Sequence, residues 1–73
     1  RSNVENLVDS MLDSAISKQS TPVNRMQRDE RLEVVSELEN TGFFLLKGGI
    51  AAAAERLGVS EPTIYRYLVK VRG

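Results

Sequence analysis

The sequence predicts a small all-α domain whose last stretch, Ile50 to Val71, forms two short helices joined by a tight turn. Ala54 is small enough to lie where two helices cross at a steep angle. Gly58 follows four residues later, where a chain that reverses direction needs a positive φ. Ser60 then offers an N-cap for the second helix, followed by an acidic residue and a proline in its first turn. These features fall at the positions that a helix-turn-helix motif requires.

Apolar residues occupy the inward positions of this motif at helical spacing. They are Leu57 and Val59 around the glycine, then Ile64, Tyr67 and Leu68 in the second helix. A helix-turn-helix of this form is typical of DNA-binding domains. The same pattern also occurs as a purely structural helical hairpin, so packing without DNA binding is the alternative interpretation.

Composition limits the chain to one small domain and excludes several kinds of site. The 73 residues include no cysteine and no histidine, which excludes disulfides, the usual zinc ligands and His- or Cys-based catalysis. We therefore expect no enzyme, no metal and no cofactor. The longest strongly apolar run, Phe43 to Leu46, is too short to span a membrane, so we expect a cytoplasmic protein with no membrane partner. Without an initiator Met or a secretory signal, the sequence looks like a fragment.

The net charge of zero conceals a division along the chain. Residues 1–41 contain eight acidic and five basic side chains, whereas residues 42–73 contain two acidic and five basic ones. A basic half suits phosphates, and an acidic half suits protein or solvent. Uneven scatter of surface charge by chance is the alternative.

The first predicted helix, within residues 1–18, is amphipathic and has an acidic outer face that would repel phosphates. Its apolar stripe can fold back on its own domain or pair with the same helix of a second chain. We favour pairing, because a linker at residues 19–26 contains Pro22 and separates this helix from the helix-turn-helix domain at 27–73. Ser2 or Asn3 can cap its start. The stripe repeats at three- and four-residue intervals and comprises Val4, Leu7, Val8, Met11, Leu12, Ala15 and Ile16.

A second helix is predicted over residues 27–40, with a start that frays and an end at Gly42 in the left-handed conformation. Its inward positions are Leu32, Val35 and Leu38, with Val34 near the edge of the stripe. The run from Phe43 to Leu46 that follows is too short for a helix and too apolar for an exposed loop. We expect it to plug the space between this helix and the helix-turn-helix.

The glycine pair Gly48 and Gly49 has two interpretations. With Lys47 it can touch a phosphate at the start of the next helix, or it can let two backbone segments come close together. A nucleotide site is not expected, because the sequence has neither a GxGxxG run nor a Walker signature.

The stretch from Arg31 to Leu68 resembles the C-terminal helix-turn-helix of the YheO-like transcriptional regulators of bacteria. The features that carry the resemblance are the helix ending before Gly42, then Phe44, Leu46, Lys47 and Gly48, and then Leu57, Ser60, Thr63, Tyr65, Tyr67 and Leu68. Proteins of this family carry a PAS-like sensor region ahead of the domain. The resemblance implies a sequence-specific transcriptional regulator whose small-molecule effector, if any, acts through a sensor outside this chain.

The second helix of the motif, about Glu61 to Arg72, is expected to lie in the major groove of double-stranded DNA. Arg66 is our first choice for a guanine contact, because its planar fork fits O6 and N7. Tyr65 can bond a phosphate or stack on a sugar, and Ser60 and Thr63 can bond phosphate, although a pure capping role is favoured for Ser60. The predicted phosphate clamps are Lys47, Lys70 and Arg72. The remaining outer residues of this helix are Glu61, Pro62 and Val69.

We expect a homodimer whose two recognition helices lie about 34 Å apart on a near-palindromic site. The alternative is a helical protein-interaction or oligomerisation module that does not bind DNA, which the acidic first helix and the zero net charge favour. A catalytic role is disfavoured, because the carboxylates form no convincing pair along the sequence.

Overall fold

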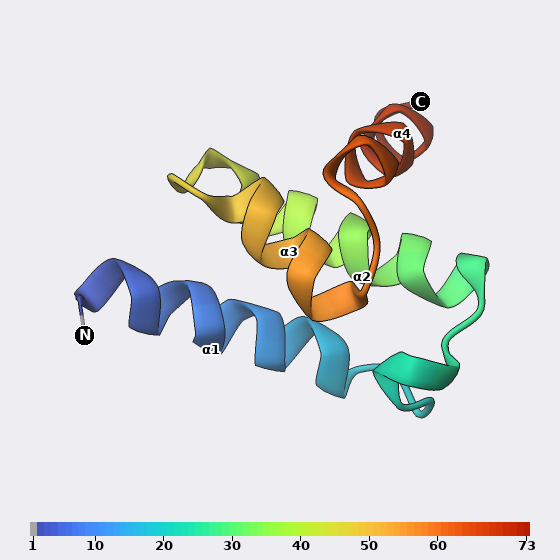
Figure 1. The fold of residues 1–73 in the computed structure, drawn as a ribbon, viewed down its shortest axis with the longest axis horizontal. Helices are drawn as coiled ribbons and strands as arrows, with labels where there is room; N and C mark the ends of the chain where they lie inside the picture. Colours follow the sequence, from blue (N-terminus) through green and yellow to red (C-terminus); the bar gives the residue numbers. More distant parts are fainter. Residues whose placement is uncertain (1) are drawn as a thin grey trace.

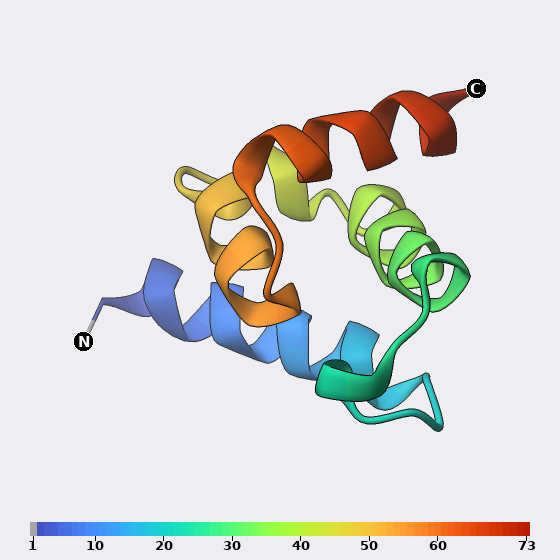
Figure 2. The same cartoon turned by 45° about the vertical axis from the view of Figure 1, so that its right-hand side comes forward.

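The computed structural model describes residues 2–73, and within them the chain is all-α with no strand, as the sequence predicts. Four α-helices and two short 3₁₀ turns follow one another (Figure 1). They are α1 (Asn3–Ser17), η1 (Val23–Arg25), α2 (Arg28–Asn40), η2 (Phe43–Leu45), α3 (Gly49–Leu57) and α4 (Glu61–Arg72). Helices α1 and α4 lie on opposite sides of the molecule, with α2 and α3 between them (Figures 1 and 2).

Helix α1 begins with a reciprocal cap. The Ser2 hydroxyl accepts from the Glu5 N–H at 3.1 Å, and the Glu5 carboxylate accepts from the Ser2 N–H at 3.3 Å. This arrangement satisfies two backbone donors that a helix start otherwise leaves unpaired. Of the two caps predicted for this helix, Ser2 is the one that the structure uses.

The apolar stripe of α1 packs against α2 and α3 of its own chain. Its buried members are Val8, Leu12 and Ala15. This is the intrachain alternative to the pairing between chains that we favoured from the sequence. The linker after α1 makes it possible, because η1 turns the chain back and buries Met26 in the same core.

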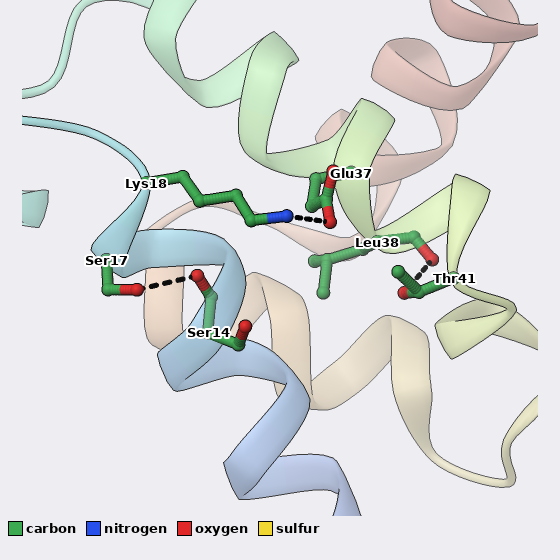
Figure 3. Close-up of polar contacts among 6 residues, drawn as sticks. All are labelled: Ser14, Ser17, Lys18, Glu37, Leu38 and Thr41. Carbon is green, nitrogen blue, oxygen red and sulfur yellow. Dashed lines mark hydrogen bonds and ion pairs between the residues drawn. The ribbon is translucent and has the colours of Figure 1, made fainter.

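Two surface ion pairs link the α1 segment to its neighbours. Lys18, just after α1, pairs with Glu37 of α2 (Figure 3), and Arg56 Nη2 of α3 lies 2.6 Å from Asp13 Oδ1. Exposed pairs of this kind contribute little each, about 0 to 1 kcal/mol. The packed stripe therefore supplies most of the attachment of α1.

The N-terminus of helix α2 is capped, contrary to the fraying that we expected. The Glu30 carboxylate accepts from the backbone N–H of Gln27, the N-cap residue, at 2.8 Å. That bond, together with the hydroxyl of Thr21, lowers the pKa of Glu30 below its ordinary value. The carboxylate in the first turn thus compensates for an N-cap residue that is not Ser, Thr, Asp or Asn.

The end of α2 follows the prediction. Gly42 has a φ of 81°, in the left-handed region, and Thr41 Oγ1 donates to the Leu38 carbonyl at 3.1 Å (Figure 3). A left-handed residue at this place stops a helix and turns the chain. More of α2 is buried than its apolar stripe predicts. Val34, which we expected near the edge of the stripe, is as fully buried as Val35 and Leu38.

The apolar run after Gly42 divides between core and solvent. Phe43 is completely buried and meets Phe44 edge to face, with ring centroids 5.2 Å apart. Leu45, in contrast, is 91% exposed, so the expectation that the whole run is a plug was wrong for this residue. In a 3₁₀ turn successive side chains point about 120° apart, which prevents three neighbours from facing one core.

Candidate nucleic-acid interface

The turn between α3 and α4 has the geometry that the sequence predicts. Gly58 has a φ of 69°, and the Val59 N–H donates back to the Ala54 carbonyl at 3.0 Å. Ala53 and Ala54 are buried where α3 approaches the rest of the core. A larger side chain at either place would overpack the core. Small residues therefore let α3 pack closely into the core, and the left-handed Gly58 makes the turn into α4.

Helix α4 separates its residues cleanly into an inner and an outer face. Ile64, Tyr67 and Leu68 are buried, as predicted. The opposite side is exposed and includes two large apolar side chains, Tyr65 at 56% and Val69 at 74% exposure. Figure 2 shows α4 along one edge of the molecule, with the other helices on one side of it. The other exposed residues of this outer face are Glu61, Pro62, Arg66 and Lys70, with Thr63 half-buried at its margin. Arg72 is also exposed, but its side chain turns toward α2.

A chain of polar contacts runs along α4 from its first residues to Arg66. The Ser60 hydroxyl accepts from the Thr63 N–H at 3.2 Å, which confirms Ser60 as the N-cap. The two hydroxyls of Ser60 and Thr63 lie 2.9 Å apart, and Arg66 Nη2 donates to Thr63 Oγ1 at 2.8 Å. The guanidinium is thereby held on the N-terminal half of the outer face.

Residues 7–69 match a known family described as a helix-turn-helix (HTH) domain. The match covers most of the chain, from the second turn of α1 to the C-terminal half of α4. The chain belongs to this HTH family. Helix-turn-helix domains are typically DNA-binding domains, so the family suggests DNA as the partner. No curated protein and no solved structure matched the chain.

In this HTH domain, the Arg72 side chain is paired with a carboxylate of the same chain. It forms a two-point ion pair with Glu39 of α2, in which Arg72 Nη2 lies 3.2 Å from Glu39 Oε1. The guanidinium lowers the pKa of Glu39, and the carboxylate raises that of Arg72. The residue that we predicted as a phosphate clamp therefore links the end of α4 to α2 in the free domain.

The glycine pair lies at the start of α3, with Lys47 just before it. These residues are therefore separated in sequence from the α4 residues. Gly48 is the left-handed N-cap of α3, with a φ of 79°. At Gly49 an added Cβ would come within 2.9 Å of the Phe43 carbonyl oxygen. For Gly49 the structure thus supports the close-approach interpretation. Lys47 is exposed and lines a shallow groove together with Val4 and Val8 of α1.

Two arginines of α2 that the site prediction omitted contact α4 of the HTH domain. Arg31 Nε donates to the Tyr67 hydroxyl at 2.9 Å, and the Arg28 guanidinium lies 5.9 Å from the centre of the same ring. Arg31 is fixed in turn by donating to the Met26 carbonyl at 2.7 Å. Their three-residue spacing puts them on one face of a helix, and this spacing is the signal that could have identified them. They belong, however, to the half of the chain that we described as acidic.

The acidic and basic halves of the sequence therefore do not form separate acidic and basic regions of the structure. Arg28 and Arg31 come from the acidic half and lie against α4. Arg56 comes from the basic half and pairs with Asp13 on α1. Over residues 2–73, no three potential metal-ligating side chains gather at one place. No helix in that same stretch is long and apolar enough to cross a membrane.

Proposed function

We propose that this HTH domain is the sequence-specific DNA-binding part of a bacterial transcriptional regulator of the YheO-like type. Helix α4 enters the major groove, and the observation that carries the proposal is its uncovered outer face with Arg66 in its N-terminal half. An α-helix fits the major groove of B-DNA, and the N-terminal residues of a recognition helix reach the base edges.

Each outer residue has a proposed role. Arg66 pairs with O6 and N7 of a guanine, and Val69, which is 74% exposed, makes an apolar contact with a base edge. Tyr65 bonds a phosphate or stacks on a sugar, Thr63 bonds phosphate, and Ser60 acts mainly as the N-cap of α4. Glu61 and Pro62 form the end of the helix that enters first. Lys47, Lys70 and Arg72 bind phosphates and fix the orientation of the domain without reading sequence.

We further propose that the domain acts as a homodimer on a near-palindromic site, and that a PAS-like region outside this chain senses the effector. Half-exposed Val4 and Leu7 at the start of α1 support an additional protein contact, because they extend the buried stripe beyond the core of one chain. A two-fold protein on a two-fold site doubles the number of base contacts.

Titration of a fluorescent mixed-sequence duplex, followed by anisotropy at about 50 mM and about 200 mM salt, tests DNA binding directly. We expect binding that weakens steeply with salt, because phosphate contacts release counterions. Selection from random duplexes should then yield a site bound at least about 10³-fold more tightly than random DNA. A protein-interaction module, the alternative, would show no salt-dependent binding to either duplex.

A further inference from the structure

We propose that Thr63 is a positioning residue that holds Arg66 ready to read a guanine, and that its hydroxyl sets the sequence preference of the domain. This inference rests on the proposed function, because it concerns the same face of α4. It is carried by the hydrogen bond from Arg66 Nη2 to Thr63 Oγ1, 2.8 Å long, and by the contact of 2.9 Å between Thr63 Oγ1 and Ser60 Oγ.

The direction of the bond between Arg66 and Thr63 follows from charge. Arg66 can only donate, so Thr63 must turn a lone pair toward the guanidinium. In the contact between the two hydroxyls either oxygen can be the donor, and Ser60 Oγ also accepts from the Thr63 N–H at 3.2 Å. A hydroxyl oxygen has two lone pairs, so Thr63 can accept from Arg66 whichever hydroxyl donates to the other.

The arrangement leaves Arg66 competent to read a base. An arginine has five N–H donors, and one of them is used by Thr63. A guanine needs two parallel donors, which the remaining four can supply. An exposed arginine normally loses much rotamer freedom on binding, whereas one held beforehand loses less. Threonine suits this role because its branched side chain has few rotamers in a helix.

Two substitutions of Thr63 distinguish the effect of its hydroxyl from the effect of its branched shape. Thr63→Val keeps the branched side chain and removes the hydroxyl, whereas Thr63→Ser keeps the hydroxyl. Both leave intact the backbone bond from residue 63 to Ser60, so the cap of α4 remains. Thr41→Val is the matched control, because the Thr41 hydroxyl donates only to a carbonyl at the end of α2.

The readout is the ratio of affinities for a selected duplex and for random duplex DNA, with far-UV circular dichroism to check folding. We expect Thr63→Val to lower this ratio about two- to ten-fold, the range for loss of one modest hydrogen bond. Thr63→Ser and Thr41→Val should keep the wild-type ratio. In the Arg66→Ala background, Thr63→Val should lower the ratio no further.

The outcomes distinguish this inference from the proposed function. If the wild-type domain shows no salt-dependent DNA binding, both are overturned. If the wild type binds its site and Arg66→Ala lowers the ratio but Thr63→Val does not, only the role of Thr63 is overturned. Equal loss of the ratio in Thr63→Val and Thr63→Ser would overturn it as well, because the methyl group rather than the hydroxyl would then be responsible.

Discussion

Arg72 and Glu39 join the last turns of α4 and α2 by two parallel contacts, one of them 3.2 Å between Arg72 Nη2 and Glu39 Oε1. A fork-to-fork pair of this kind fixes both the distance and the orientation of the two groups. It therefore contributes to the angle at which α4 crosses α2. The same guanidinium is the one that we propose to contact a phosphate, so DNA and Glu39 compete for it.

The Glu39→Gln substitution should lower the free energy of unfolding at pH 7 and have less effect in acid. The pKa of Glu39 in the folded state is below its ordinary value of 4.5, because Arg72 donates to the charged form. Its contribution is thus fully present above pH 4.5 and disappears as the pH falls through the lowered pKa. Urea denaturation of both proteins at neutral and acid pH measures this difference.

Glu55→Gln is the control for that experiment, because Glu55 is an exposed carboxylate on α3. It should leave the stability nearly unchanged at both pH values. A gap between Glu39→Gln and wild type that widens on acidification would contradict the assigned pair.

Phe43→Ala should destabilise the domain by about 3 to 5 kcal/mol, because it empties a completely buried site between α2 and α3. Leu45→Ala, two residues later, should change the stability by no more than about 0.5 kcal/mol, since this side chain is 91% exposed. Thermal or urea denaturation compares the two. Similar losses for both variants would mean that Leu45 is covered in solution, for example by a second copy of the chain.

Arg66→Ala should cost about 1 to 3 kcal/mol of binding free energy on the selected site and relax the preference for one base pair. Removing the side chain takes away a two-point contact that only one base pair can accept. Affinity measurements on the selected site and on duplexes changed at single positions show which base pair is involved. Equal loss on the selected site and on random DNA would reassign Arg66 to the phosphate backbone.

Lys70→Ala should weaken binding to all duplexes alike and reduce the salt slope by about one unit. Lys70 is exposed on the outer face of α4, and a lysine ammonium on a phosphate reads no sequence. Anisotropy titrations over a series of salt concentrations give the slope. An unchanged slope would remove Lys70 from the phosphate contacts.

The proposed homodimer should appear in sedimentation at high protein concentration, and on a selected site its two half-sites should lie about 34 Å apart. Leu7→Glu, which places a charge on the half-exposed end of the α1 stripe, should shift the distribution toward monomer. Glu is a good helix former, so α1 should persist in this variant. A monomeric wild type at high concentration would exclude self-association of this domain.

Local signals in the sequence were sufficient for much of the fold. Gly42 and Gly58 are left-handed as expected, because few other residues adopt a positive φ without strain. Ser60 caps α4, and Ile64, Tyr67 and Leu68 face the core, because both features depend on spacing along one helix. These relationships involve residues no more than a few positions apart.

Relationships between distant residues were decided only by the tertiary structure. The sequence could not show that Arg31 meets Tyr67, that Arg72 meets Glu39 or that Arg56 meets Asp13, since each pair joins different helices. The sequence by itself therefore determined where helices begin, end and turn their apolar faces, which are matters of backbone preference and periodicity. Which charges remain available to a partner was settled by how those helices pack, because packing chooses the neighbours of every long side chain.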